Sequence, residues 1–169
     1  RKNLTEAVET TAEITAMVFM ILLGSSIFSL VFRGFGGDDL ITGIFTELPG
    51  GAFGAVLVVM IIIFLLGFIL DFIQITLVVV PIVGPALLML GVDPIWLGIM
   101  IAINLQTSFL TPPFGFALFY LRGVAPDTLA TKDIYRGVLP FILIQIGVLF
   151  VLALFPELVT ALPEAVYGN

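Results

Sequence analysis

The sequence contains no cysteine and no histidine. The absence of cysteine excludes disulfide bonds, thiol nucleophiles and thiolate metal sites, and the absence of histidine excludes imidazole ligands and Ser-His catalysis. Charged residues are also scarce, at 11% of the chain, and the net charge of -6 does not suit a nucleic-acid-binding surface. We therefore expect neither an enzyme nor a nucleic-acid-binding protein.

Apolar residues dominate what is present. They make up 60% of the chain, and the mean hydropathy is +1.26. Soluble domains average roughly half apolar and a quarter charged residues. The composition therefore predicts an integral membrane protein, and its long apolar runs of helical length predict an all-α membrane protein with several spanning helices.

The N-terminal third predicts one membrane span with polar flanks. The chain begins at Arg1 rather than Met and shows no signal peptide, so we expect it to be a C-terminal piece of a longer protein. Residues 1–13 contain three glutamates and predict an interfacial amphipathic helix. Residues 14–32 are long enough to cross a core of ~30 Å. Residues 33–51 predict a periplasmic loop.

Residues 52–90 form two apolar runs around the stretch "DFIQIT" at 71–76. One interpretation is a span, a turn in water and a second span. The other is a re-entrant hairpin whose tip, near residues 67–76, holds polar residues at membrane depth. Surface turns are usually richer in Gly, Asn and Lys, whereas this one interleaves Phe and Ile. We favour the re-entrant hairpin.

Residues 94–121 predict a discontinuous transmembrane helix. Asp93 is a suitable N-cap and Pro94 a suitable first residue, whereas "TPPFG" at 111–115 breaks the helix. A cytoplasmic loop at 122–133, a last transmembrane helix at 134–155 and a periplasmic tail at 156–169 complete the prediction.

The basic residues predict the orientation. Five of the six Lys and Arg residues lie before the first span or between residues 122 and 136, and Arg33 is the exception. The positive-inside rule places both regions in the cytoplasm. The acidic loop and the tail then lie outside, provided that residues 52–90 enter and leave from one face.

A break inside a membrane exposes backbone groups that can bind ligands. Freed carbonyls can coordinate Na⁺, and freed amides at a half-helix N-terminus can bind a carboxylate. Neutral oxygens crowd the approach to the break, with Thr107 and Thr111 on one helix face and Asn104 and Ser108 on another. These side chains suit Na⁺ binding, although the same residue types also bridge helices. Asp71 is either an ion ligand or an N-cap of the second hairpin arm.

The patterns "PIVGP" after an acid, "LGVDPIW" and "TPPFG" occur in this order between residues 71 and 115. The chain closely resembles, from about residue 10 to residue 155, the C-terminal part of the DctM-like large permease subunit of tripartite ATP-independent periplasmic (TRAP) transporters. This resemblance implies the second of two inverted repeats of an elevator-type ion transporter.

The resemblance also implies a mechanism and partners. It implies Na⁺-driven import of small organic acids across the bacterial inner membrane, with Na⁺ as coupling ion and no other cofactor. The partners would be a small four-helix membrane subunit, a periplasmic substrate-binding protein and the N-terminal repeat. Because "TPPFG" occurs once, the first repeat is absent, and we expect no transport by this chain alone.

The predicted sites combine both lines of reasoning. The predicted Na⁺-binding residues are Gly67, Asp71, Thr107, Thr111, Pro112 and Gly115. The predicted substrate-binding residues are Gln74, Asn104, Ser108, Thr111 and Pro113. Two alternatives stay open: a Na⁺-coupled carboxylate symporter that works without a binding protein, and a channel or scaffold subunit that does not transport.

Overall fold

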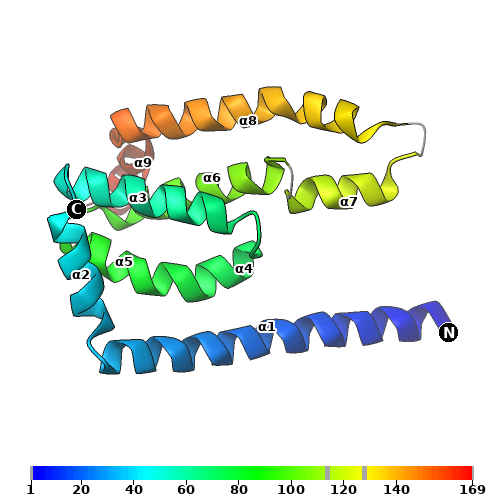
Figure 1. The fold of residues 1–169 in the computed structure, drawn as a ribbon, viewed down its shortest axis with the longest axis horizontal. Helices are drawn as coiled ribbons and strands as arrows, with labels where there is room; N and C mark the ends of the chain where they lie inside the picture. The colour runs from blue at the N-terminus through cyan, green and yellow to red at the C-terminus, as the bar shows by residue number, and fades with distance from the viewer. Residues whose placement is uncertain (1, 113–114, 127–128, 169) are drawn as a thin grey trace.

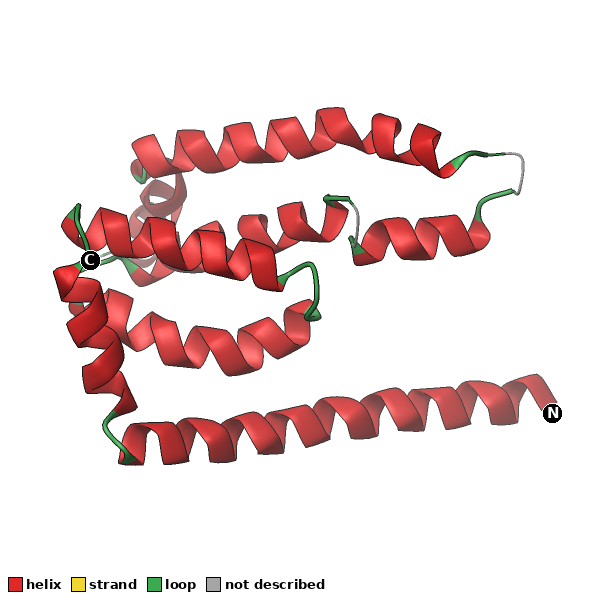
Figure 2. Ribbon diagram, in the orientation of Figure 1, coloured by secondary structure: helices red, strands yellow, loops and turns green. Residues whose placement is uncertain are grey.

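The computed structural model describes residues 2–112, 115–126 and 129–168, and within them all regular structure is helical (Figure 2). The predicted all-α class is therefore confirmed. The elements are α1 (Lys2–Gly34), α2 (Gly37–Glu47), α3 (Gly51–Leu66), α4 (Phe72–Gln74), the π-helix η1 (Ile75–Val79), α5 (Val80–Met89), α6 (Pro94–Leu110), α7 (Phe116–Val124), α8 (Thr131–Leu154) and α9 (Glu157–Tyr167).

The N-terminal region differs from the prediction of two separate elements. Residues 1–13 and 14–32 are not divided, because α1 is continuous from Lys2 to Gly34. Residues 2–23, which include the predicted boundary, contain no glycine or proline that could end a helix. At 1.5 Å per residue, α1 is about 50 Å long and exceeds a hydrocarbon core of ~30 Å.

The predicted loop at 33–51 is mostly helix. α2 crosses the end of α1 steeply (Figure 1) and is bounded by two glycines in the left-handed region, Gly36 at φ 76° and Gly50 at φ 95°. α2 and α3 meet at 113°. At the other end of α2, where it follows α1, Arg33 forms an ion pair of 3.6 Å with Asp38, which explains how a basic residue is accommodated on the acidic side.

α3 and the α4–η1–α5 arm form an antiparallel hairpin (Figure 1). The turn comprises residues 67–71, so it is shorter than the predicted tip at 67–76, because helix resumes at Phe72. In Figure 1 the turn lies beside the break between α6 and α7, well short of the end at which the N-terminus lies. With 16 residues, α3 is about 24 Å long and too short to cross a ~30 Å core unaided.

The second arm of the hairpin contains a π-helical turn with an identifiable cause. The amide of Val80 donates to the carbonyl of Ile75, five residues back, and Pro81 follows directly. A proline inside an α-helix has no amide to donate, and its ring collides with the carbonyl four residues earlier. The wider π register removes that collision, and π turns are frequent at functional sites.

The N-terminus and the α7–α8 connection lie at one end of the molecule (Figure 1). α2 and the α5–α6 and α8–α9 connections lie at the other end. The basic residues near the N-terminus and near the α7–α8 connection therefore lie at the same end of the molecule. The predicted orientation places both groups in the cytoplasm and stays a prediction. The predicted tail at 156–169 differs, since residues 157–167 form helix α9.

The core lies between α3, α5 and α6, where Ile63, Leu87 and Val59 are almost fully buried. α8 is attached to it by Trp96, whose indole N–H donates to the carbonyl of Leu152 at 2.8 Å. The outward sides of α1 and α8 are largely apolar and exposed. Three helical stretches of the described chain are long and apolar enough to span a bilayer: Asn3–Gly34, Phe72–Met89 and Thr131–Leu154.

Candidate functional site

The turn of the hairpin leaves backbone carbonyls available. The amides of residues 67–70 donate to carbonyls within the last turn of α3, such as Gly67 to Ile63 at 2.9 Å and Leu70 to Leu66 at 2.8 Å. In the part of the chain that the structure describes, no hydrogen bond reaches the carbonyls of residues 67–70 themselves. These oxygens are therefore available to a cation or to a neighbouring segment.

Asp71 and Gln74 close the turn as a capping box. The Asp71 carboxylate accepts from the backbone amide of Phe72 at 2.7 Å, and the side-chain oxygen Oε1 of Gln74 accepts from the backbone amide of Asp71 at 3.3 Å. The pair satisfies backbone donors at the start of the second arm. Asp71 therefore has the N-cap role, one of its two predicted roles, and its carboxylate keeps further lone pairs for other partners.

The turn lies directly against α6 at Gly67. A Cβ atom built on Gly67 would overlap the hydroxyl of Ser108 and lie 2.8 Å from its Cβ. Gly67 and Ser108 are both buried, and they are 41 positions apart in the sequence. Only glycine therefore permits this approach of the hairpin turn to the end of α6.

Three hydroxyls line the last turns of α6. Each donates to a carbonyl of its own helix: Thr107 to Ile103 at 2.7 Å, Ser108 to Leu105 at 2.9 Å and Thr111 to Thr107 at 2.7 Å. A hydroxyl that donates its proton in this way presents its oxygen lone pairs outward. Thr107 and Ser108 are fully buried, so any partner of these oxygens must itself be buried.

The break begins at Thr111, whose backbone is extended at φ -83° and ψ 123°. The Thr111 amide donates to Ser108 and the Gly115 amide donates to Thr111, each at 3.1 Å. A Cβ on Gly115 would lie 2.5 Å from the carbonyl oxygen of Phe109 and 3.0 Å from that of Thr111. Gly115 thus lets the start of α7 approach the last carbonyls of α6.

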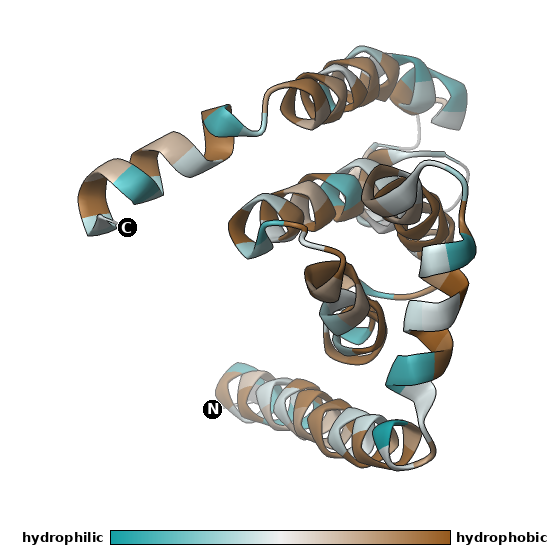
Figure 3. Ribbon diagram, turned by 90° about the vertical axis from the view of Figure 1, so that its left-hand side faces the viewer, coloured by the Kyte–Doolittle hydropathy of each residue, from teal (hydrophilic) through white to brown (hydrophobic). Residues whose placement is uncertain are grey.

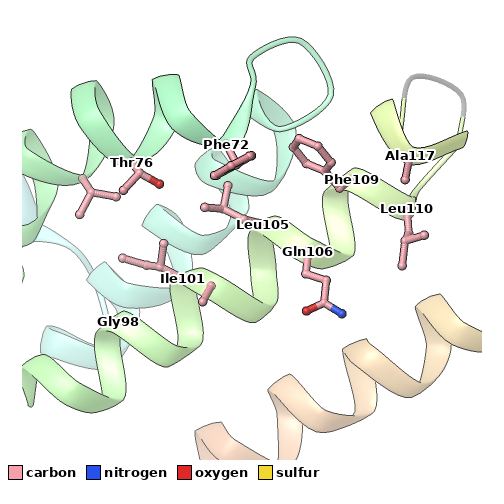
Figure 4. Close-up of a pocket in the computed structure, with 11 residues that line it drawn as sticks. Phe72, Thr76, Gly98, Ile101, Leu105, Gln106, Phe109, Leu110 and Ala117 are labelled. Atoms are coloured by element: carbon pink, nitrogen blue, oxygen red, sulfur yellow. The ribbon is translucent and has the colours of Figure 1, made fainter. Parts of the chain in front are cut away.

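A groove of about 700 Å³ runs beside these elements (Figure 4). The rings of Phe72 and Phe109 meet edge to face across it, with centroids 5.9 Å apart. Thr76 and Gln106 supply its polar groups, and the Gln106 amide points away from the two rings (Figure 4). The sequence offered no sign of the ring pair, because the two residues are 37 positions apart.

A family profile described as the tripartite ATP-independent periplasmic transporter, DctM component, matches residues 1–158. The chain belongs to the DctM family. The match includes both arms of the hairpin, the break and α8, so the geometry described above is that of a DctM chain.

Curated relatives agree with this assignment. The chain is 28% identical to the sialic acid TRAP transporter large permease protein SiaM of Vibrio cholerae over 96% of its length. It is 30% identical to the ectoine/5-hydroxyectoine TRAP transporter large permease protein UehC of Ruegeria pomeroyi over 97% of its length. It is 34% identical to the 2,3-diketo-L-gulonate TRAP transporter large permease protein YiaN of Escherichia coli over 61% of its length.

The DctM chain is much shorter than these proteins. It spans 38% of SiaM and of UehC, and 24% of YiaN. No solved structure matches it. Its apolar helices and its family support a multi-pass membrane protein.

The structure brings most of the predicted site residues to one place in this DctM chain. Gly67, Asp71 and Gln74 lie in or next to the hairpin turn, and Thr107, Ser108, Thr111, Pro112 and Gly115 lie at the end of α6 and in the break. Pro113 lies outside the described residues. The ligand roles of these residues stay predictions.

Asn104 is placed differently from the other predicted substrate-binding residues. It is buried one turn deeper in α6, and its amide donates to the carbonyl of Met60 in α3 at 2.8 Å. Its amide nitrogen therefore joins α6 to the first arm of the hairpin. Sequence reasoning allowed both roles, and the contact with a residue 44 positions away supports the bridging one.

Replacing Asn104 by aspartate is expected to destabilise the DctM chain. An ionised carboxylate there would face the Met60 carbonyl in a buried site and replace an attractive contact by a repulsive one. Breaking such a contact costs roughly 1–3 kcal/mol. Thermal unfolding in detergent would measure this loss, and Gln106→Glu at an exposed position of the same helix is the matched control. Equal melting temperatures for the two variants would contradict the bridging role.

Proposed function

We propose that this DctM chain is the C-terminal part of the membrane permease of a Na⁺-coupled secondary transporter that imports small organic acids. One observation carries the proposal: a hairpin turn with unused carbonyls lies against the broken end of α6, with Gly67 in contact range of Ser108. Paired discontinuities of this kind hold ions and substrates in membrane transporters.

The Na⁺ site would lie between the hairpin turn and the break. Carbonyl oxygens of residues 67–70 would approach from one side, and the hydroxyl oxygens of Thr107 and Thr111 from the other. These donors are neutral oxygens, which suit a monovalent cation at the C-terminal end of a half-helix. Within the described residues no group of three His, Cys, Asp or Glu side chains could hold a metal ion instead.

The carboxylate of the substrate would bind at the start of α7. Gly115 is its N-cap residue and supplies no side-chain cap, and the Leu118 amide already donates to the Gly115 carbonyl at 2.9 Å, so the amides of residues 116 and 117 would be the ones that bind an anion. Ser108, at the end of α6, and Gln74, next to the hairpin turn, would be its polar neighbours. A cationic group from the N-terminal repeat would balance the negative charge of the substrate carboxylate.

The rest of the transporter is proposed from the family and from the length of the relatives. Since the chain spans 38% of SiaM, the other inverted repeat would supply the second half of the site. A small four-helix membrane subunit and a periplasmic substrate-binding protein would complete the assembly in the bacterial inner membrane. Na⁺ binding would close the hairpin and favour the loaded state of an elevator movement, in which the hairpin re-enters from the outer face.

The direct test is uptake by the full-length permease with its small subunit and binding protein. Sialic acid, a C4-dicarboxylate and 2,3-diketo-L-gulonate serve as probes, because relatives are named for them. Uptake of at least one probe is expected to require an inward Na⁺ gradient. Uptake that is unchanged when choline replaces Na⁺ would refute Na⁺ coupling, and uptake without the binding protein would favour the simpler symporter.

Thr111→Val is expected to weaken Na⁺ binding selectively. Valine keeps the shape but removes the oxygen, and loss of one such contact is worth about 1–2 kcal/mol, or roughly tenfold in the half-saturating Na⁺ concentration. The Na⁺ dependence of the melting temperature measures this, since a ligand at 100 times its Kd stabilises by about 2.7 kcal/mol.

Thr11→Val is the matched control, because the Thr11 hydroxyl also donates to its own helix at 2.7 Å but lies exposed on α1. It should keep the full Na⁺ response. An unaltered response in Thr111→Val would remove this hydroxyl from the site. Absence of any Na⁺ response in the parent permease would favour a scaffold or channel.

A further inference from the structure

Helix α9 has two chemically distinct sides. Leu158, Leu162 and Val166 recur every four residues and are 64%, 72% and 65% exposed, and we call them the apolar stripe. Glu157 and Glu164 lie on the other side: at 100° per residue, Leu162 and Glu164 are about 160° apart around the helix axis. Exposed apolar and acidic residues are thus separated rather than mixed.

The protein covers only the beginning of this helix. Val159, in its first turn, packs against the hydrophobic core, and α9 contacts α6. Beyond that turn the helix projects away from α8 and from the rest of the chain, with brown and teal residues on different sides (Figure 3). The apolar stripe therefore has no cover within the described residues.

The position of α9 relative to a bilayer follows from α8. α8 has 24 residues and is long enough to cross the membrane, with Lys132 and Arg136 near its start. It ends at Leu154, and α9 begins after a break of two residues at a steep angle to it (Figures 1 and 3). α9 therefore starts at the level where the span leaves the hydrocarbon.

A second observation marks the same level. The indole of Trp96 donates to the carbonyl of Leu152 in the last turn of α8. Trp96 is itself buried in the core, so this contact fixes the last turn of α8 against the start of α6. Tyr167, at the end of α9, is 85% exposed. Tyrosine is enriched at membrane interfaces, where its ring meets lipid and its hydroxyl meets water, so Tyr167 fits an interfacial position of α9.

We propose that α9 lies in the membrane interface on the outer side, with the apolar stripe buried in lipid and Glu157 and Glu164 in water. The apolar stripe continues the lipid-facing surface of α8, where Phe150 and Leu154 are also exposed. An apolar face separated from a charged face is the arrangement of an interfacial helix, and in α9 the charged face is acidic.

The helix would then act as an anchor at the outer end of α8. α8 is locked to α6 by Trp96, so α9 fixes the depth of this helix pair in the bilayer. The family match ends at residue 158 and covers only the first two residues of α9. The inference therefore rests on the sequence and geometry of this chain and is independent of Na⁺ coupling.

The chain has no cysteine, so single-cysteine variants can be spin-labelled directly. Leu162→Cys and Glu164→Cys would be labelled in the full chain and reconstituted in phosphatidylethanolamine and phosphatidylglycerol vesicles. Collision with oxygen reports lipid, and collision with a nickel chelate reports water. The ratio of oxygen to nickel accessibility is expected to be at least roughly threefold higher at position 162 than at 164.

Two further variants calibrate the measurement. Phe150→Cys on the exposed side of α8 defines the lipid value, and Asp133→Cys at its basic end defines the water value. Equal accessibility to the nickel chelate at positions 162 and 164 would overturn the proposal, because α9 would then lie in water. Shielding of position 162 from both reagents would also overturn it and would show that protein covers the apolar stripe.

Discussion

Gly67→Ala is expected to separate the hairpin turn from α6 and to lower the stability of the protein. The added Cβ would overlap the Ser108 hydroxyl and lie 2.8 Å from its Cβ, so either helix must shift. Overpacking of this kind costs typically about 1–3 kcal/mol. The apparent melting temperature in detergent and the Na⁺-dependent stabilisation should both fall, because the shift also moves the carbonyls of residues 67–70.

A double-mutant cycle tests whether the collision with Ser108 causes the loss of stability in Gly67→Ala. Ser108→Gly removes the atoms with which the new methyl collides, so Gly67→Ala should be nearly neutral in that background. Gly24→Ala is the matched control, since a Cβ there meets nothing within 4 Å and alanine has the better helix propensity. If Gly67→Ala is equally harmful with and without Ser108→Gly, the turn and α6 are not packed as described.

Gly115→Ala is expected to have the larger effect on transport. Its Cβ would lie 2.5 Å from the carbonyl oxygen of Phe109 and 3.0 Å from that of Thr111. These are backbone atoms, which cannot rotate away as the Ser108 side chain can. The start of α7 must therefore move from the end of α6. Na⁺-dependent uptake by the full-length permease should fall at least roughly tenfold, equivalent to about 1.4 kcal/mol.

Gly123→Ala in α7 is the matched control. A Cβ at Gly123 would have no atom within 4 Å, so this variant should retain uptake. Helix content by circular dichroism would show whether Gly115→Ala still folds. A folded Gly115→Ala protein with the uptake of the parent would show that the close approach of α7 to α6 is not needed for transport.

Several local features were predictable because their causes are local. The start of α6 follows from Asp93 and Pro94, and the Asp93 carboxylate does accept from the amide of Trp96 at 2.8 Å. Proline and glycine disfavour the interior of a helix, so Pro112 and Gly115 separate the end of α6 from the start of α7. The two helical segments predicted at residues 1–13 and 14–32 join into one helix, because residues 2–23 contain no glycine or proline and polarity alone does not end a helix.

Long-range partners were beyond the sequence for a physical reason. Gly67, Asn104 and Phe72 each contact a residue about 40 positions away in the sequence. These partners depend on how the helices cross, and local residue patterns do not encode helix crossing. The bridge from Asn104 to Met60 and the ring contact between Phe72 and Phe109 became visible only in the fold. Sequence reasoning could name candidate ligands but could not say which of them face one another.

The sequence by itself determined that this is an all-α membrane protein with a discontinuity at residues 111–115, because apolarity and helix breakers act locally, and its motifs carried the resemblance to the DctM family. Only the tertiary structure decided that the hairpin turn meets that discontinuity. The approach depends on glycine at positions 67 and 115, where the absence of a side chain lets the backbones of separate elements come together.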